Sequence, residues 1–167
     1  MSKPEAWLRG PVDGVPPLLQ PVAHSLIQSR EEVEALLAPL AAEEIWRTRG
    51  TAASVGFHVR HALGSLDRLL TYARGAPLSD AQLQVLKLES LPDPDLAADD
   101  LIVGFAAGVE RALAQMRETN PATLTDERLV GRARLASTVI GLLVHAAEHT
   151  QRHVGQAAST WKLLAQS

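Results

Sequence analysis

Apolar residues recur every three or four positions in four long stretches of this chain, which is the spacing of a helix with one buried face. The pattern predicts helices over residues 17–39, 52–74, 96–118 and 137–164. Pro39, Gly75 and Pro121 stand where the first three of these patterns stop, as expected for residues that end helices. A capping box beginning at Ser29 could divide the first stretch, but the apolar period continues across it and favours a single helix.

The segments between these helices are long. Residues 1–15 are rich in proline and glycine and predict an extended lead-in, whereas 40–50 and 119–136 predict irregular connectors. Residues 79–90 begin with a second capping box and predict a short extra helix. Ser137 is expected to cap the last helix. The interpretation is an all-α fold, a four-helix bundle that forms one domain over residues 1–167. The long connectors indicate that the order of its helices is not a series of simple hairpins.

Composition narrows the class of protein. The chain is 46% apolar and 21% charged, and aromatic residues make up only 4%, which is typical of a globular helical protein. The net charge of −3 gives no basic footprint for nucleic acid. No apolar stretch approaches the roughly 20 residues of a membrane span, and the first residues lack a secretory signal, so a cytoplasmic protein without a membrane partner is expected. Cysteine is absent, which excludes thiolate metal ligands and a cysteine nucleophile.

Three histidines four residues apart are the strongest chemical pattern. His145, His149 and His153 fall on successive turns of the last predicted helix, and His58 and His61 lie in the second. Buried imidazoles need partners for their ring nitrogens, and a divalent metal supplies one partner to several rings at once. A metal site between these two helices is therefore the leading hypothesis.

The alternative is that these histidines are satisfied core or surface residues, which is the more common role of a lone HxxxH pair. The histidines of the second predicted helix favour the metal-site hypothesis. Periodicity leaves open whether His58 or His61 points inward, because His61 lies beside the small residues Gly64 and Ser65. No glutamate stands immediately after the first histidine of either HxxxH pair, so a zinc protease of the HExxH type is not supported. Arg68 is interpreted as a surface charge, with an anion contact as the alternative.

At these residues the chain resembles the DinB/YfiT-like superfamily of metal-dependent proteins. The matching stretches are Ser54–His61 and Glu148–Gln156. The family pattern has one histidine seven positions after a Ser or Thr, which is His61 here, and an HxxxH followed by Gly-Gln, which gives His149 and His153. No ligand position of the pattern is missing. The resemblance extends weakly over nearly the whole chain.

The resemblance implies a bundle of up-down-down-up order, a metal held by His61, His149 and His153, and a homodimer. A divalent metal, zinc or nickel, is the expected ion. Related branches resemble thiol S-transferases that use bacillithiol, mycothiol or glutathione. The functional hypothesis is a metal-dependent transferase or hydrolase that acts on a small molecule through a bound thiol or water. The alternative is a non-catalytic metal-binding scaffold dimer.

Overall fold

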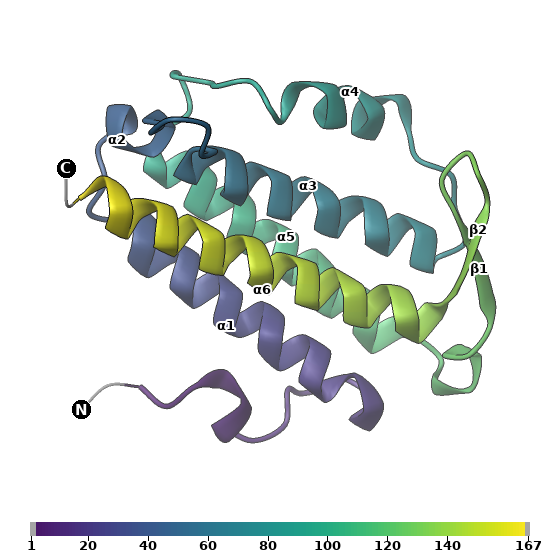
Figure 1. The fold of residues 1–167 in the computed structure, drawn as a ribbon. Coiled ribbons are helices and arrows are strands. Elements are labelled where there is room, and N and C mark those ends of the chain that lie inside the picture. Colours follow the sequence, from purple (N-terminus) through teal and green to yellow (C-terminus); the bar gives the residue numbers. More distant parts are fainter. Residues whose placement is uncertain (1–2, 166–167) are drawn as a thin grey trace.

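Four long helices make up most of the computed structural model, which describes residues 3–165 (Figure 1). The mainly helical fold predicted from the apolar pattern is confirmed. The long helices are α1 (Gln20–Leu37), α3 (Val55–Ala73), α5 (Ala98–Glu118) and α6 (Val139–Leu164). The remaining elements are α2 (Ala42–Trp46), α4 (Asp80–Leu88), strands β1 (Glu127–Val130) and β2 (Leu135–Thr138), and 3-10 turns at Ala6–Leu8, Pro17–Leu19 and Pro121–Thr123.

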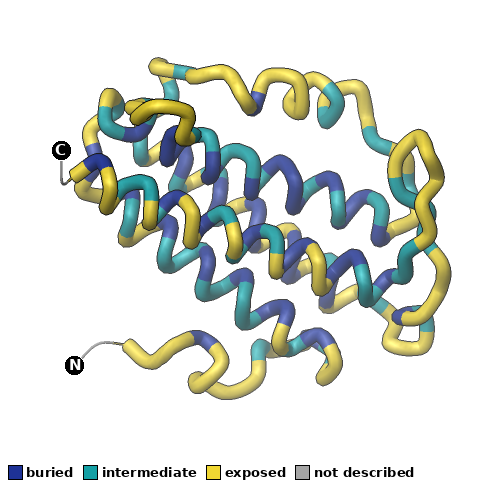
Figure 2. The backbone as a smooth tube through the Cα atoms, viewed as in Figure 1, coloured by how far each residue is buried: buried dark blue, intermediate teal, exposed yellow. Residues whose placement is uncertain are grey.

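The four long helices enclose one continuous apolar core. Helices α1 and α3 each pack against both α5 and α6, so every long helix has two long neighbours. Figure 1 shows that α1 and α6 run in one direction and α3 and α5 in the other. Buried positions lie along the inward faces of all four helices (Figure 2), and the largest fully buried side chains include Phe105, Leu26, Leu66 and Leu143.

A crossover segment, residues 74–97, connects the parallel helices α3 and α5. The chain leaves α3 at one end of the bundle and must return to the other end before α5 begins. Helix α4 forms part of this return and lies along the outside of α3. None of the residues within α4 is buried, and its first residues are held by the predicted capping box, in which Ser79 and Gln82 exchange hydrogen bonds. Helix α4 ends at Leu88, and Glu89 directly after it is buried.

Most helix boundaries agree with the sequence prediction to within a few residues. Helix α1 is a single helix, and the hydroxyl of Ser29 donates to the Ser25 carbonyl instead of capping a new helix. Ser54 caps α3 by accepting a hydrogen bond from the Phe57 amide. The predicted cap of α6 is wrong by one residue: Thr138 accepts the Gly141 amide, because Ser137 is paired with Arg128 between β1 and β2.

Three segments predicted to be extended or irregular contain regular structure. The lead-in carries the 3-10 turn at Ala6–Leu8, and the connector 40–50 contains α2. The connector 119–136 contains β1 and the start of β2, which runs on to Thr138, and the turn of this hairpin has positive φ at Gly131 and at Arg134. Four-residue strands are too short to show alternation in the sequence, and the hairpin is held from outside, since Arg128 Nε donates to the Ala73 carbonyl at the end of α3, 2.9 Å away.

Gly56 allows α2 to pack against the start of α3. A Cβ atom at position 56 would lie 2.7–2.8 Å from three atoms of the Trp46 ring. That ring is fixed by a hydrogen bond from its Nε1 to the Leu96 carbonyl (3.2 Å) and by the Arg60 guanidinium above it. Only glycine therefore fits at this position without moving Trp46.

Gly56→Ala is expected to lower the free energy of unfolding by about 1 kcal/mol or more, because overpacking a fixed ring costs more than the better helix propensity of alanine returns. Gly155→Ala is the matched control on α6, where a Cβ atom would have no neighbour within 4 Å. That change should raise the free energy of unfolding by up to about 1 kcal/mol. Urea denaturation of both variants measures the difference, and equal stabilisation by the two changes would show that Trp46 moves aside freely.

Candidate metal centre

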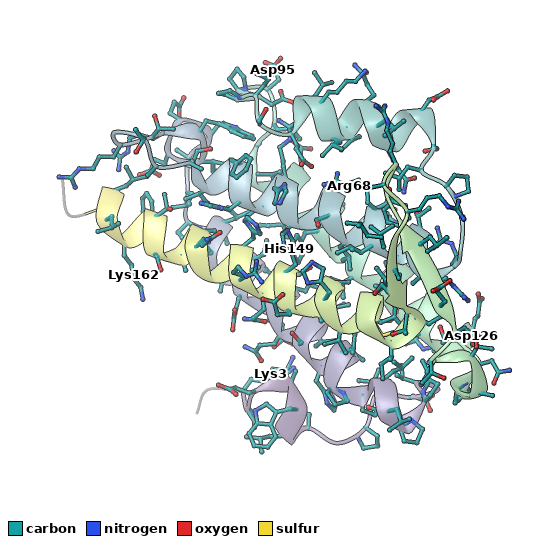
Figure 3. The ribbon with its side chains drawn as sticks, turned by 45° about the vertical axis from the view of Figure 1, so that its right-hand side comes forward. Lys3, Arg68, Asp95, Asp126, His149 and Lys162 are labelled. Atoms are coloured by element: carbon teal, nitrogen blue, oxygen red, sulfur yellow. The ribbon has the colours of Figure 1, made fainter. Side chains whose placement is uncertain are left out.

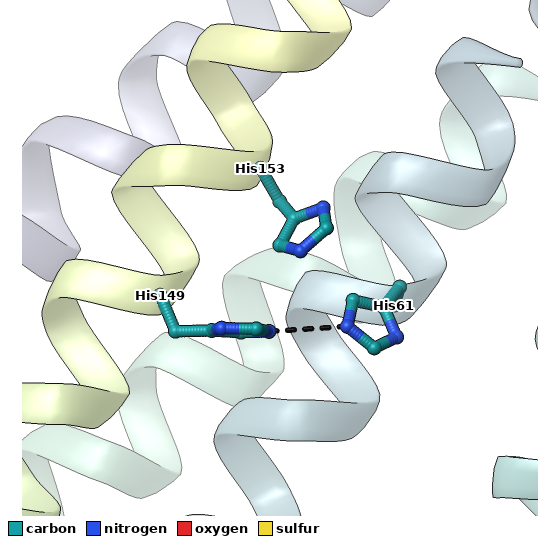
Figure 4. A group of neighbouring side chains, drawn as sticks. All are labelled: His61, His149 and His153. Atoms are coloured by element: carbon teal, nitrogen blue, oxygen red, sulfur yellow. Dashed lines mark hydrogen bonds between the residues drawn. The ribbon is translucent and has the colours of Figure 1, made fainter. Parts of the chain in front are cut away.

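Helices α3 and α6 lie side by side and bring histidines from distant parts of the chain together. His61 projects from α3, and His149 and His153 project from consecutive turns of α6 (Figure 4). Figure 3 shows His149 midway along α6. The rotation of α6 is fixed by Thr150, which is fully buried, and by Gln151, which accepts a hydrogen bond from Ser29 and donates one to Glu32 on α1. These contacts leave the flanking histidines facing α3.

The ring nitrogens of the three histidines converge. One ring nitrogen from each of His61, His149 and His153 lies within 4.8 Å of the others. The Nε2 atoms of His61 and His149 are 3.1 Å apart. Among residues 3–165, these are the three histidine, aspartate or glutamate side chains that lie close enough together to share a metal ion. The three histidines that the sequence analysis selected are thus brought together, and metal binding by them stays a prediction.

The two alternative histidines lie outside this group. His58 is buried, and its Nδ1 lies 3.1 Å from Nδ1 of His153, so it contacts one member of the group from behind. His145 has half of its side chain exposed and lies 3.3 Å from a carboxylate oxygen of Glu148. Glu148 also pairs with Arg152 on the exposed side of α6.

Burial favours the neutral form of His149 and His153. Desolvation lowers the pKa of His153 to about 4, and the neighbouring charges of His61 and His149 add to this effect. Desolvation, followed by the charge of His61, also lowers the pKa of His149 and of His58. Neutral imidazole is the form that binds metal ions, so the lowered pKa values of His149 and His153 favour metal binding by these two rings at neutral pH.

The donor set fits a divalent metal. A Zn–N bond is about 2.0–2.1 Å long, so ligand nitrogens on one ion lie up to roughly 4 Å apart. The mutual spacing of the three ring nitrogens, within 4.8 Å, is close to this requirement. His149 Nδ1 is also buried without a hydrogen-bond partner in the described part of the chain. A buried nitrogen that the protein leaves unsatisfied is unusual, and it indicates a site whose rings are not fully accommodated by protein contacts alone.

Two charged residues that were not assigned to the site from the sequence lie beside the group. Glu89, directly after α4, is 4% exposed, and its Oε1 lies 2.8 Å from Nδ1 of His61. Arg68 is buried and donates to both carboxylate oxygens of Glu89, so its interpretation as a surface charge is wrong. Burial by itself raises the pKa of Glu89, but hydrogen bonds from His61 and Arg68 outweigh it and hold that pKa below its usual value.

The sequence contains one weak signal of this pair. Gly64 lies three residues after His61, and a Cβ atom there would come within 2.8 Å of Glu89 Oε2 and 2.9 Å of Arg68 Nη1. The small residues beside His61 therefore do mark a close approach, although the approaching groups are side chains and not a ligand. Nothing in the local sequence around Glu89 distinguishes it from the other acidic residues of the crossover.

A helical fold with three imidazoles converging from two adjacent helices defines the class of protein. The chain belongs to the DinB superfamily, whose sequence model matches residues 25–157. The structure is also similar to the crystal structure of a conserved protein from Enterococcus faecalis, with a TM-score of 0.68 and 22% sequence identity over 89% of this chain and 98% of that one. That likeness shows the shared fold. No curated protein matches the chain.

None of the helices in the described region combines the length and apolar character needed to cross a membrane.

Proposed function

We propose that this protein is a metal-dependent enzyme that acts on a small molecule, either by transferring a thiol or by hydrolysis. The observation that carries the proposal is the convergence of His61, His149 and His153 from two helices. Three imidazole ligands are the donor set of catalytic zinc sites, in which a further position is kept for water or substrate. All three side chains are partly exposed, which supports access from solvent.

A divalent metal held there would lower the pKa of a bound water or thiol and supply a nucleophile at neutral pH. Zinc and nickel are the ions that we favour, since imidazole suits both. The chain has no cysteine, so any thiol in the reaction must come from a low-molecular-weight co-substrate. Burial favours the neutral form of His149 and His153, and the contact with Glu89 orients His61. The half-buried position of the rings limits the water around them.

Metal analysis tests the proposal. Protein purified without a histidine tag and loaded with zinc is expected to retain one ion per chain after desalting. The double variant His149→Ala/His153→Ala should retain none, because a single remaining imidazole binds weakly. His145→Ala is the matched control: it removes a histidine from the same helix, one turn from His149, but outside the converging group. It should keep the full complement of metal.

Metal content and turnover of the same three proteins decide whether the proposal holds. Equal metal content in the wild-type protein and the double variant would contradict a site at these residues. Retained metal in the wild type then permits an assay for conjugation of low-molecular-weight thiols and for hydrolysis of activated esters and amides. Turnover that disappears in the double variant and persists in His145→Ala would support an enzyme acting at this site.

A further inference from the structure

The carboxylate of Glu89 joins the crossover segment to the histidine group. Its Oε1 is 2.8 Å from Nδ1 of His61, and Arg68 donates to its Oε2 over 3.0 Å and to its Oε1 over 3.2 Å. Glu89 is separated from His61 by 28 residues and from Arg68 by 21 residues, so only the tertiary fold brings the three together. Both charged side chains are buried, which makes their pairing obligatory.

The contact decides which nitrogen of His61 carries the proton. A carboxylate paired with arginine can only accept hydrogen bonds, so Nδ1 of His61 must donate to it. A neutral imidazole has one N–H group, and Nε2 of His61 therefore presents a lone pair. That Nε2 atom is the one that faces Nε2 of His149.

His61 differs in this respect from the other two members of the group. The Nδ1 atom of His153 contacts another imidazole, that of His58, and either ring can donate in such a pair. The Nδ1 atom of His149 is buried without a partner in the described chain. Among the three, His61 is thus the ring whose tautomer is set by a residue that cannot donate.

Gly64 makes room for this arrangement. It lies one turn after His61 on α3, and any larger residue would place a Cβ atom 2.8 Å from Glu89 and 2.9 Å from Arg68. The absence of a side chain at this position lets the ion pair lie directly on the helix. The carboxylate then reaches His61 from the α4 side, while His149 approaches from the α6 side.

We propose that Glu89, oriented by Arg68, is a positioning residue that holds His61 with Nδ1 protonated and Nε2 free for a metal ion. This inference rests on the proposed metal-dependent function. A carboxylate behind a metal-binding histidine fixes the ring and makes its other nitrogen a stronger donor, and loss of such a partner typically weakens metal affinity about 10–100-fold. Glu89 plays this role from the crossover segment, which itself supplies none of the three histidine ligands.

A purely structural role must be separated from this positioning role, because Glu89 also attaches α4 to α3. Gln82 provides the control. Its side-chain amide donates to Asp67 and Thr71 on α3, so it fastens the same helix without contacting the histidines. Gln82→Ala should loosen the crossover as Glu89→Ala does, while leaving His61 and its carboxylate partner in place.

Two measurements test the proposal. Zinc affinity is measured by competition with a coloured chelator, and the tautomer of His61 is measured in the metal-free protein from the two-bond 15N–1H correlations of its ring. Wild-type protein and Gln82→Ala should show Nδ1 protonated in His61 and zinc affinities within about twofold of each other. Glu89→Ala should show a mixture of tautomers and an affinity about 10–100-fold lower.

Glu89→Gln covers the case in which Glu89→Ala does not fold. The amide keeps an acceptor oxygen for His61 but loses the charge, so the tautomer should persist with a smaller loss of affinity. The proposal is overturned if His61 keeps a protonated Nδ1 in Glu89→Ala, or if Gln82→Ala weakens zinc binding as much as the Glu89 variant. Failure of wild-type protein to bind zinc would refute the proposed function, whereas the tautomer measurement would still report on Glu89.

Discussion

Saturating zinc should raise the melting temperature of the metal-free protein by roughly 8–16 °C. An ion that binds only the folded chain stabilises it by about 4 kcal/mol when its free concentration is 1,000 times the dissociation constant. For a chain of this length, each kcal/mol corresponds to roughly 2–4 °C. The effect is large because the ligands come from α3 and α6, so the site exists only when these two helices are packed together.

Differential scanning calorimetry with and without zinc measures this shift, and the double variant His149→Ala/His153→Ala provides the control. Its melting temperature should be the same in both conditions. A shift of equal size in the double variant would place the stabilising ion elsewhere. If the shift is present but thiol conjugation and hydrolysis are not detected, the non-catalytic scaffold becomes the better hypothesis for this protein.

Phe105→Ala is expected to cost about 3–5 kcal/mol of stability, the usual range for removing a buried phenylalanine from a core. Phe105 on α5 is 1% exposed and belongs to the core shared by the four long helices. Neighbouring side chains cannot close the resulting cavity completely, because helix packing fixes their backbones. Urea denaturation should therefore show a clearly lower midpoint with a similar slope.

Val103→Ala is the matched control on the same helix, two residues away and 68% exposed. It should change the free energy of unfolding by no more than about 0.5 kcal/mol. A small loss for Phe105→Ala, comparable with that of the control, would contradict the assignment of Phe105 to the core. The folded fraction of Phe105→Ala should still bind zinc normally, since its side chain is not part of the histidine group.

The placement of the site depends on the order of the helices. Because α3 and α5 run in the same direction, the chain needs residues 74–97 to return along the bundle. This return carries Glu89 to the back of His61. A simple hairpin between α3 and α5 would provide no residue at that position. The long connector therefore contributes to the candidate site and not only to the connection between helices.

The sequence by itself determined the four long helices and the shared face of His149 and His153. Apolar residues with helical spacing identify a helix and its buried face whatever it packs against, and Pro39 and Gly75 limit helices through their own backbone geometry. His149 and His153 share a face because they are four residues apart on one helix. His61 was selected through the family resemblance, since periodicity left it undecided against His58.

Only the tertiary structure decided which groups surround these histidines. The rotation of α3 relative to α6 brings His61 into the group and places His58 behind His153. The apolar pattern of a single helix contains no information about its rotation relative to a neighbouring helix. Glu89 and Arg68 meet across the crossover, so no local spacing predicts their pairing. The hairpin β1–β2 likewise depends on pairing between strands and on support from α3, both of which arise from contacts outside the segment itself.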